Sequence, residues 1–489
     1  MQCYKFANFL HVLNLKGLIS MALSIYSTLS RQQREFTSLE PNHVRMYVCG
    51  VTVYDYCHIG HGRTFVAFDV IRRWLEASGY KVTFVRNVTD VDDKIIRRAH
   101  ERNISTDALT EEYTRYMQED MIALGCLEPT HEPRATQYIG SMLNLVKILE
   151  EKGFAYQAAD GDVDFAVRSF DGYGKLSGKR LDRQQSGARV EVATSKRDPL
   201  DFVLWKAAKP GEPAWESPWG KGRPGWHIEC SAMAQDILGT TIDIHGGGPD
   251  LMFPHHENEI AQSEAASGQT FARYWMHSGP LRVRNADGTE EKMSKSLGNF
   301  WTIRDALKET NETFGDKNGA EVLRFFLLRS HYRSPVTFGP HLIEDAQKAL
   351  VRLYGALKDR ADDGQALDWS ERFASRFAAA MNDDFNTPLA VSVLFDLAAE
   401  IHRMNDPALV RQLRGLGKVL NILQLDPQSF LQGNVKADDS TRIEGLIQDR
   451  AQAKKERNFA RADQIRADLL AEGIELMDAP TGTTWRRIS

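Results

Sequence analysis

The sequence predicts an α/β protein in which a parallel-sheet domain carries a small inserted domain and is followed by an α-helical C-terminal region. Two observations support this fold class. Near the N-terminus a buried strand, an amphipathic helix and a second strand follow one another at the spacing of a βαβ unit, which requires a parallel sheet. Beyond about residue 319, almost every segment has a helical pattern of apolar residues. A chain of 489 residues also exceeds a single core and indicates several domains.

The first strand is expected at Val44–Val53, a run rich in Val, Met and Tyr. A helix follows from Arg63, with its apolar residues on one face, and ends at Gly79. The second strand is expected at Lys81–Val88. Two or three helices then fill the chain to about Gly153, so that residues 22–154 form the first half of the α/β domain.

Residues 155–224 differ in character, because short alternating stretches and frequent Gly, Pro and Trp predict hairpins. We interpret them as a connective insertion, after which residues 225–318 complete the α/β domain. The elements expected in this second half are a helix at Glu229–Leu238, a strand at Thr241–His245, a helix from Pro254 and a strand at Trp275–His277.

The helical region is expected to consist of a linker at 319–365, a bundle at 366–430 and a tail at 440–489. The tail carries a helix pair from Arg442 to Ala471 and several basic residues. These are Lys454, Lys455, Arg457, Arg461 and Arg466, with Trp485–Arg487 beyond them. A run of charge is usually a solvated helix face, and acidic residues alternate with this one, so alone it is a modest signal for RNA binding.

Composition excludes several classes of protein. With 42% hydrophobic and 26% charged residues, the chain has the balance of an ordinary folded protein. Its net charge of −5 gives no overall sign of a nucleic-acid binder, although RNA enzymes concentrate positive charge locally. The chain has five cysteines, a small and odd number that argues against a disulfide scaffold. The lack of such a scaffold favours a cytoplasmic location. No segment is predicted to span a membrane. Residues 1–21 are interpreted as a non-essential N-terminal extension.

The first motif with chemical meaning is His58-Ile59-Gly60-His61, in the turn between the first strand and its helix. Two histidines at a helix N-terminus can contact nucleotide phosphates together, since free backbone N–H groups and positive potential gather there. A pair of surface histidines would give the same four residues, so the motif alone does not decide between the two.

The second motif is Lys292-Met293-Ser294-Lys295-Ser296, in a loop far along the chain. Two lysines among small hydroxyl residues suit a loop that neutralises a triphosphate while charge builds on it. A solvated charged loop is the simpler interpretation, and it is usually right for segments of Lys and Ser.

A third group of residues has the chemistry of a metal site. Cys49 ends the first strand, and Cys230, His255 and Glu259 occur much later. His255 and Glu259 are four residues apart, so on a helix they share a face. Two thiolates, an imidazole and a carboxylate make a plausible zinc set, placed at the carboxyl edge of the sheet by Cys49. The alternatives are buried free cysteines, an exposed helix pair, and a purely structural metal.

The first two motifs, in this order on an α/β framework, resemble the HIGH and KMSKS signatures of class I aminoacyl-tRNA synthetases, which have a Rossmann-like catalytic domain. The resemblance becomes specific to the cysteinyl-tRNA synthetase family over nearly the whole chain, from about Leu23 to Arg487. Its further segments are Tyr47–Gly50, Asn87–Lys94, Gly225–Cys230, Asp243–Gly248, Asp250–Glu259 and Met381–Pro388.

This resemblance implies roles for individual residues. The implied zinc ligands are Cys49, Cys230, His255 and Glu259, and the implied lining of the amino-acid pocket is Gly50, Thr89 and Trp226. The implied catalytic residues are His58, His61, Lys292 and Lys295, of which His58, His61 and Lys295 would bind ATP. Of the zinc ligands, Glu259 is the one that an incoming substrate sulfur would weaken or displace.

The activity implied by the resemblance is activation of L-cysteine with ATP to cysteinyl-adenylate and its transfer to the 3′ end of tRNA(Cys). One zinc ion per chain and Mg²⁺ with ATP are the expected cofactors, and a monomer is expected. A pocket that discriminates by side-chain size alone separates cysteine from serine poorly. Zinc, in contrast, binds a thiolate much better than a hydroxyl. We therefore expect no editing domain, and the C-terminal helices are expected to place the anticodon.

Three other functions share part of this pattern. A ligase that attaches cysteine to an aminosugar would keep the zinc set and both motifs but would not explain the long helical region. A catalytically silent RNA-binding paralogue would not need His58, His61, Lys292 and Lys295 intact. A simple nucleotidylyltransferase with two such histidines would need neither the zinc set nor the tail.

Overall fold

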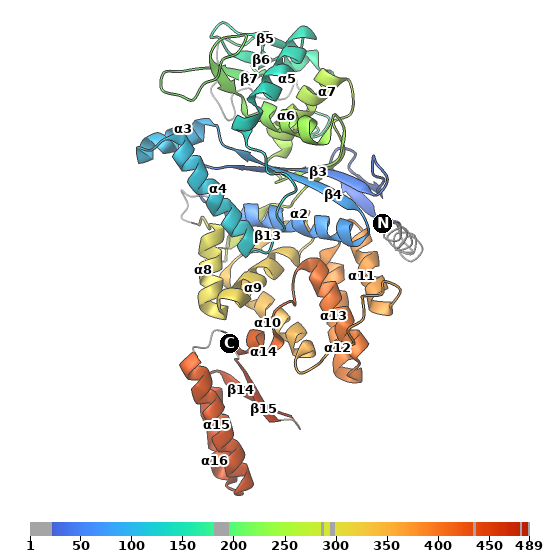
Figure 1. Cartoon of the computed structure of the whole chain (residues 1–489), viewed down its shortest axis with the longest axis vertical. Coiled ribbons are helices and arrows are strands. Elements are labelled where there is room, and N and C mark those ends of the chain that lie inside the picture. The colour runs from blue at the N-terminus through green and yellow to red at the C-terminus, as the bar shows by residue number, and fades with distance from the viewer. Residues whose placement is uncertain are drawn as a thin grey trace, which may run out of the picture.

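The computed structural model describes residues 22–179, 195–284, 288–293, 299–433, 437–479 and 482–487. Figure 1 shows an elongated molecule in which the insertion lies at one end and the last two helices lie at the other. The central sheet and the helical bundle lie between these ends. The N-terminal extension 1–21 and Lys295 fall outside the described residues.

The central sheet is parallel, as the sequence predicts, and has the strand order β10-β9-β3-β4. Its strands are β3 (His43–Thr52), β4 (Lys81–Thr89), β9 (Ile242–Gly247) and β10 (Ala272–His277). The two strands from beyond the insertion therefore extend the sheet that the first βαβ unit begins. The insertion interrupts the chain but not the sheet.

The helix of that unit, α2 (Ile59–Ala77), begins four residues before the expected Arg63. Its first turn carries no apolar stripe, but the His58 ring accepts a hydrogen bond from the His61 backbone and so caps it. Capping by a side chain at this position fixes a helix start that periodicity alone does not show.

Strand β3 sends alternate side chains to opposite faces of the sheet. Val44, Met46 and Val48 belong to the large core shared with α2 and the helical bundle, whereas Tyr47 and Cys49 belong to a second core shared with the insertion side. The pairing of β3 with β4 shifts register between Val48 and Val51. A bulge of this kind turns the backbone at Cys49 and Gly50 out of the regular ladder.

The insertion forms a small antiparallel sheet in the order β5-β6-β7-β8, which matches the expected hairpins. Its strands are β5 (Ala155–Gln157), β6 (Val163–Phe165), β7 (Phe202–Ala207) and β8 (Gly222–Pro224). The helices before and after it are α3 (Asp93–Arg102), α4 (Thr106–Ala123), α5 (Ile139–Glu151), α6 (Trp226–Leu238) and α7 (Glu257–Ser267), with short turns at Ala135–Tyr138, Val167–Ser169 and Met252–His256.

The expectation of an almost entirely helical C-terminal region is confirmed for most of its length. Its helices are α9 (Asp316–Leu328), α10 (Pro340–Leu357), α11 (Arg372–Asn382), α12 (Thr387–Met404), α13 (Pro407–Leu420), α14 (Pro427–Gln432), α15 (Ala437–Lys455) and α16 (Phe459–Ala471). The helix before them, α8 (Ile303–Phe314), lies at the end of residues 225–318. Among the described residues, no helix is both long and apolar enough to cross a membrane.

In the part of the chain that the structure describes, seven strands lie outside the central sheet and the insertion. They are β1 (Ser24–Ser27), β2 (Gln32–Glu35), β11 (Leu281–Arg284), β12 (Glu290–Lys292), β13 (Val336–Phe338), β14 (Ile474–Ala479) and β15 (Gly482–Arg487). The last two form an antiparallel hairpin that the sequence pattern did not predict. Its buried residues Ile474, Leu476 and Trp485 pack with α15 and α16 in a third, separate core.

Buried polar contacts join the bundle to the α/β domain. Arg324 on α9 donates to the Asp69 carboxylate on α2 at 2.5 Å and to the backbone oxygens of Leu124 and Leu420 at 2.9 Å. Asp384, between α11 and α12, accepts a hydrogen bond from the Tyr26 backbone at 2.9 Å. The Arg324 contacts fix the bundle against the helix that starts at the His58 turn, and the Asp384 contact fixes it against Ser24–Ser27.

Candidate active site and metal centre

The predicted site residues of the α/β domain gather at the carboxyl edge of the central sheet. Cys49 and Gly50 lie near the end of β3, Thr89 is the last residue of β4, and His58 lies at the start of α2. Parallel strands end and their helices begin at the same edge, which is where α/β proteins bind ligands. The fold therefore places residues from distant parts of the sequence around one location.

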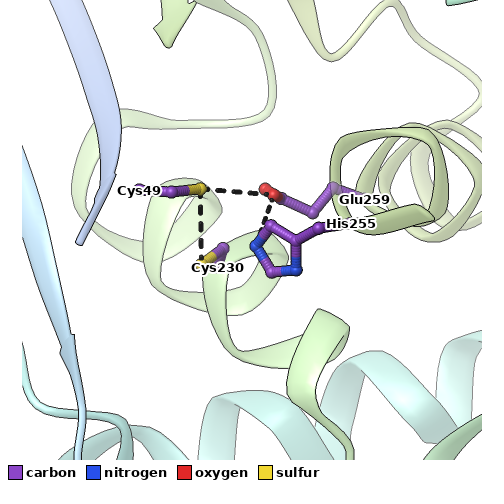
Figure 2. A group of neighbouring side chains, drawn as sticks. All are labelled: Cys49, Cys230, His255 and Glu259. Carbon is purple, nitrogen blue, oxygen red and sulfur yellow. Dashed lines mark hydrogen bonds and ion pairs between the residues drawn. The ribbon is translucent and has the colours of Figure 1, made fainter. Parts of the chain in front are cut away.

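Four of these side chains form a compact, buried cluster, which Figure 2 shows. The Cys49 thiol donates to the Cys230 sulfur at 3.8 Å and lies 3.4 Å from a carboxylate oxygen of Glu259. The Nε2 atom of His255 lies 3.0 Å from the same oxygen. One ligand atom from each of the four residues lies within 4.8 Å of the others.

The chemistry of this cluster fits zinc. Two sulfurs, an imidazole nitrogen and a carboxylate oxygen are donors that zinc accepts, and two thiolates on a tetrahedral zinc ion lie about 3.8 Å apart. Burial raises the pKa of Cys49, and its neighbour Cys230 raises it further. Burial also opposes ionisation of Cys230, but hydrogen bonds from Cys49 and His255 lower its pKa to about 6. The cluster thus already holds one readily ionised thiol.

Glu259 and His255 have opposite pKa shifts. Burial acts to raise the pKa of Glu259, but the charges of His245 and His255 bring it well below its usual range. Burial acts to lower the pKa of His255, but Glu259 and Cys230 raise it to about 10. The proton on His255 supplies positive charge in the place where a metal ion would supply it.

Further histidines surround the cluster, and sequence reasoning did not single them out. His245 Nε2 lies 2.8 Å from the second oxygen of Glu259, and His227 Nδ1 lies 3.0 Å from Nδ1 of His255. Such outer contacts orient metal ligands. Cys49, His245, His256 and Glu259 also converge as a second combination of possible ligands. His227, His245 and His256 all lie inside segments that resemble the family. This resemblance is the sequence signal that could have identified them as site residues.

The expected amino-acid pocket residues border this cluster. The Gly50 backbone donates to Asn87 Oδ1 at 2.8 Å, and a Cβ atom at Gly50 would lie 1.7 Å from the Asn87 backbone oxygen. The ring of Trp226, on the first turn of α6, stacks on His255 with centroids 4.4 Å apart. The Thr89 hydroxyl is buried and donates to Glu229 at 2.8 Å.

Glu229 was not among the expected site residues. It lies one residue before Cys230 on α6 and is 1% exposed. Its Oε2 atom accepts the bond from Thr89, whereas Oε1 has no hydrogen-bond partner among the described residues. Burial raises its pKa well above the usual range, with Cys230 adding to the effect. A sequence gives no sign of such a site, because most glutamates on helices face solvent.

The two histidines of the His58 turn stack with ring centroids 3.6 Å apart. The His58 backbone donates to Nδ1 of His61, and the His61 backbone donates to Nδ1 of His58, each at 3.2 Å. Because both Nδ1 atoms accept, these contacts assign the ring protons to Nε2. Burial lowers the pKa of His61 well below its usual value, which keeps this ring neutral.

The residues that follow the Lys292–Ser296 motif in the sequence lie next to the His58 turn. Lys292 is the last residue of β12, and Lys295 lies outside the described residues. The backbone of Ile59 donates to Trp301 at 3.0 Å, and that of Ile303 donates to Cys57 at 2.8 Å. The segment after the second motif is therefore paired with the first.

Comparison with known proteins gives a consistent result. Residues 35–348 match the family model of the tRNA synthetases class I (C) catalytic domain, and residues 376–425 match the DALR domain. A cysteine–tRNA ligase of Cupriavidus pinatubonensis is 58% identical over 471 residues, covering 95% of this chain and 99% of the relative. One from Dechloromonas aromatica is 56% identical over 467 residues, covering 95% of this chain and all of the relative.

Solved structures agree at the level of the fold. Mycobacterium tuberculosis methionyl-tRNA synthetase in complex with methionyl-adenylate has a TM-score of 0.52 at 16% identity, over 79% of this chain and 91% of that one. A putative arginyl-tRNA synthetase from Campylobacter jejuni has a TM-score of 0.51 at 15% identity, over 80% of this chain and 95% of that one. At these identities the likeness concerns architecture alone.

Proposed function

The chain belongs to the cysteine–tRNA ligase family within the class I tRNA synthetases, and from this premise we propose how its residues perform that reaction. It is a ligase that activates L-cysteine with ATP and transfers cysteine to the 3′ end of tRNA(Cys). The assignment of the site rests mainly on one observation, the buried cluster of Cys49, Cys230, His255 and Glu259 at the carboxyl edge of the sheet.

In this proposal, the four residues of the cluster hold one zinc ion per chain. When bound, zinc supplies a soft Lewis acid that selects a thiolate over a hydroxyl. The chain's own residues orient this site: His245 fixes the second oxygen of Glu259, and Trp226 covers His255. Gly50, Thr89 and Trp226 line the amino-acid pocket beside it.

ATP is proposed to bind at the His58 turn. Nδ1 of both rings accepts from a backbone N–H group, so the ring proton of each lies on Nε2, the atom that is proposed to donate to phosphate oxygens. The N-terminus of α2 adds positive potential at the same place. Lys292 and Lys295 neutralise charge that builds on the α-phosphate and pyrophosphate, together with Mg²⁺. The attacking group is the substrate carboxylate, so no protein nucleophile is required.

The C-terminal end of the chain is proposed to contact the anticodon. Lys455, Arg457 and Arg461 are exposed around the turn between α15 and α16. The ring of Phe459, in the same turn, is 60% exposed and available for stacking on a base. Other basic residues of the region are already engaged, since Arg450 and Lys454 pair with Asp478 at 2.7 Å and 3.3 Å.

The remaining parts of the proposal concern organisation. Residues 22–154 and 225–318 form the catalytic domain, 155–224 the connective insertion, 319–365 the linker that contacts the tRNA stem, and 366–430 the bundle. The chain is proposed to act as a monomer in the cytoplasm. Sparse cysteines that are free where the structure describes them support a reducing compartment.

The deciding experiment is cysteine-dependent exchange of pyrophosphate into ATP, followed by charging of tRNA(Cys). We expect both activities, with serine supporting neither at concentrations where cysteine saturates. Exchange without charging would favour the aminosugar ligase, and the absence of both would favour a silent RNA-binding paralogue. Either result would overturn the proposed function.

A further inference from the structure

We propose that Glu229 binds the amino group of the amino-acid substrate and, through Thr89, sets the orientation of the pocket that receives it. This inference rests on the proposed function, because it concerns the substrate of the same site. It begins from a carboxylate that is almost fully buried and has one oxygen without a hydrogen-bond partner among the described residues. A buried carboxyl oxygen in that state is unfavourable unless a hydrogen-bond donor or a cation reaches it.

None of the described residues forms an ion pair with Glu229. The described ion pairs of nearby bases go to other acids, for example Arg223 to Glu212 and Lys206 to Asp93. A cysteine substrate carries a primary ammonium group, which has three N–H donors and the opposite charge.

Glu229 occupies the right place for that group. Trp226, Glu229 and Cys230 are spaced i, i+3 and i+4 on α6, so they share one face of the helix. Trp226 stacks on His255, and the Cys230 sulfur belongs to the metal cluster. Only two carbon atoms separate the sulfur of cysteine from its nitrogen. A substrate whose sulfur reaches this cluster therefore brings its ammonium group beside Glu229.

A chain of hydrogen bonds runs from the end of β3 through the end of β4 to the carboxyl group of Glu229. The Gly50 backbone donates to Asn87 Oδ1 at 2.8 Å, and Asn87 Nδ2 donates to Thr89 Oγ1 at 3.3 Å. The Thr89 hydroxyl then donates to Glu229 Oε2 at 2.8 Å. Because this hydroxyl gives its only proton to Glu229, its second lone pair stays available to accept from the substrate ammonium.

The geometry therefore assigns two contacts to the ammonium group: Oε1 of Glu229 and the free lone pair of Thr89. Glu229 determines specificity through the first contact and positions Thr89 for the second. An uncharged residue of the same shape would keep the fold but lose the charge. Glu229→Gln is such a change, and a carboxyl with a merely structural role would tolerate it.

The test compares three ligands of the zinc-loaded, full-length chain. Pyrophosphate exchange gives KM for L-cysteine, and competitive inhibition of the exchange gives Ki for two analogues. Cysteamine keeps the thiol and the amino group, whereas 3-mercaptopropionate keeps the thiol and the carboxylate. We expect Glu229→Gln to raise KM for cysteine and Ki for cysteamine about tenfold or more, and to change Ki for 3-mercaptopropionate less than about twofold.

A matched control is Asp90→Asn, which removes a neighbouring negative charge that is bound instead to Thr136 at 2.6 Å and 2.9 Å. It should change all three constants by less than about threefold. The inference is overturned if Glu229→Gln leaves cysteine binding unchanged, if it weakens 3-mercaptopropionate as much as cysteine, or if Asp90→Asn has the same selective effect. Wild-type protein without cysteine-dependent exchange would instead refute the proposed function.

Discussion

His58 and His61 cap the same helix end by exchanging hydrogen bonds, each ring accepting from the other residue's backbone at 3.2 Å. This arrangement requires both Nδ1 atoms to be unprotonated. The turn that is proposed to bind phosphate is therefore also a structural element whose stability depends on pH.

A decline in stability at acid pH follows from His61. The unfolded chain takes up a proton on this residue as the pH falls through about 6.5, whereas burial keeps the folded ring neutral to a much lower pH. The stabilisation is thus fully present above pH 6.5 and is lost as the pH falls. We expect His61 to account for at most about 2 kcal/mol of the decrease in unfolding free energy between pH 7.5 and pH 5.

Urea unfolding at the two pH values, with His61→Asn beside the wild type, measures this contribution. The variant should be less stable at pH 7.5 but should show the smaller decrease toward pH 5. Equal pH dependence in both proteins would mean that His61 titrates alike in the folded and unfolded chains.

The metal assignment predicts a selective effect of Cys230→Ser. We expect this variant to lose most of its bound zinc and to raise KM for cysteine at least about tenfold, because a hydroxyl is a poor zinc ligand. Cys126→Ser is the matched control, since Cys126 packs against the large core and belongs to neither set of possible ligands. Elemental analysis and exchange kinetics supply the readouts. Full zinc content and unchanged selectivity in Cys230→Ser would refute the assignment.

Two glycines should respond to alanine in opposite directions. At Gly50 a Cβ atom would overlap the Asn87 backbone oxygen, so Gly50→Ala should cost about 1–3 kcal/mol or more and impair cysteine activation. At Gly355, inside α10, a Cβ atom meets nothing within 4 Å, and alanine should stabilise by about 0.5–1 kcal/mol. Thermal unfolding and exchange assays test the pair. A tolerated Gly50→Ala would show that the bulge in β3 can move.

The buried ion pair between α2 and α9 predicts a large loss of stability. Arg324→Met leaves Asp69 buried with Arg73 as its one cationic partner among the described residues, and we expect a loss of about 3–5 kcal/mol. Lys147→Ala removes an exposed pair with Glu151 on α5 and should cost less than about 1 kcal/mol. Denaturant unfolding of the two variants is the measurement. Comparable losses would contradict the view that burial makes the difference.

The proposed anticodon contact predicts a separation of the two half-reactions. Phe459→Ala should raise KM for tRNA in the charging assay, because stacking of one base is worth about 1–3 kcal/mol. Pyrophosphate exchange should not change. Leu470→Ala removes an apolar side chain that is 50% exposed on the same helix, and it should affect neither assay. Equal effects of the two substitutions on charging would argue against a specific contact.

The sequence predicts the parallel sheet and its first βαβ unit well because Val44–Val53 and Lys81–Val88 carry strong local patterns. The bundle is predicted for the same reason, and α11, α12 and α13 lie within the expected residues 366–430. The hairpin β14–β15 was not predicted because its alternation of apolar and polar residues is short and follows two long helical patterns. Its register depends on packing Trp485 against α15 and α16, which local pattern does not contain.

Site prediction had a different limit. Cys49, Cys230, His255 and Glu259 were found because their residue types suit a metal and their surroundings resemble a family. The proposed role of Glu229 depends on its burial beside Thr89 and on an oxygen that has no hydrogen-bond partner among the described residues. Neither property can be seen in a sequence, since both arise when α6 packs against the end of β4.

The third core has an evolutionary consequence. Residues 437–487 bury Ile443, Ile465, Leu469 and Trp485 among themselves, and none of these side chains belongs to the two larger cores. Substitutions that reshape this module for a different RNA surface need no compensating change around the metal cluster or the His58 turn. The proposed recognition of RNA at one end of the molecule and the proposed chemistry at the other can therefore diverge at independent rates.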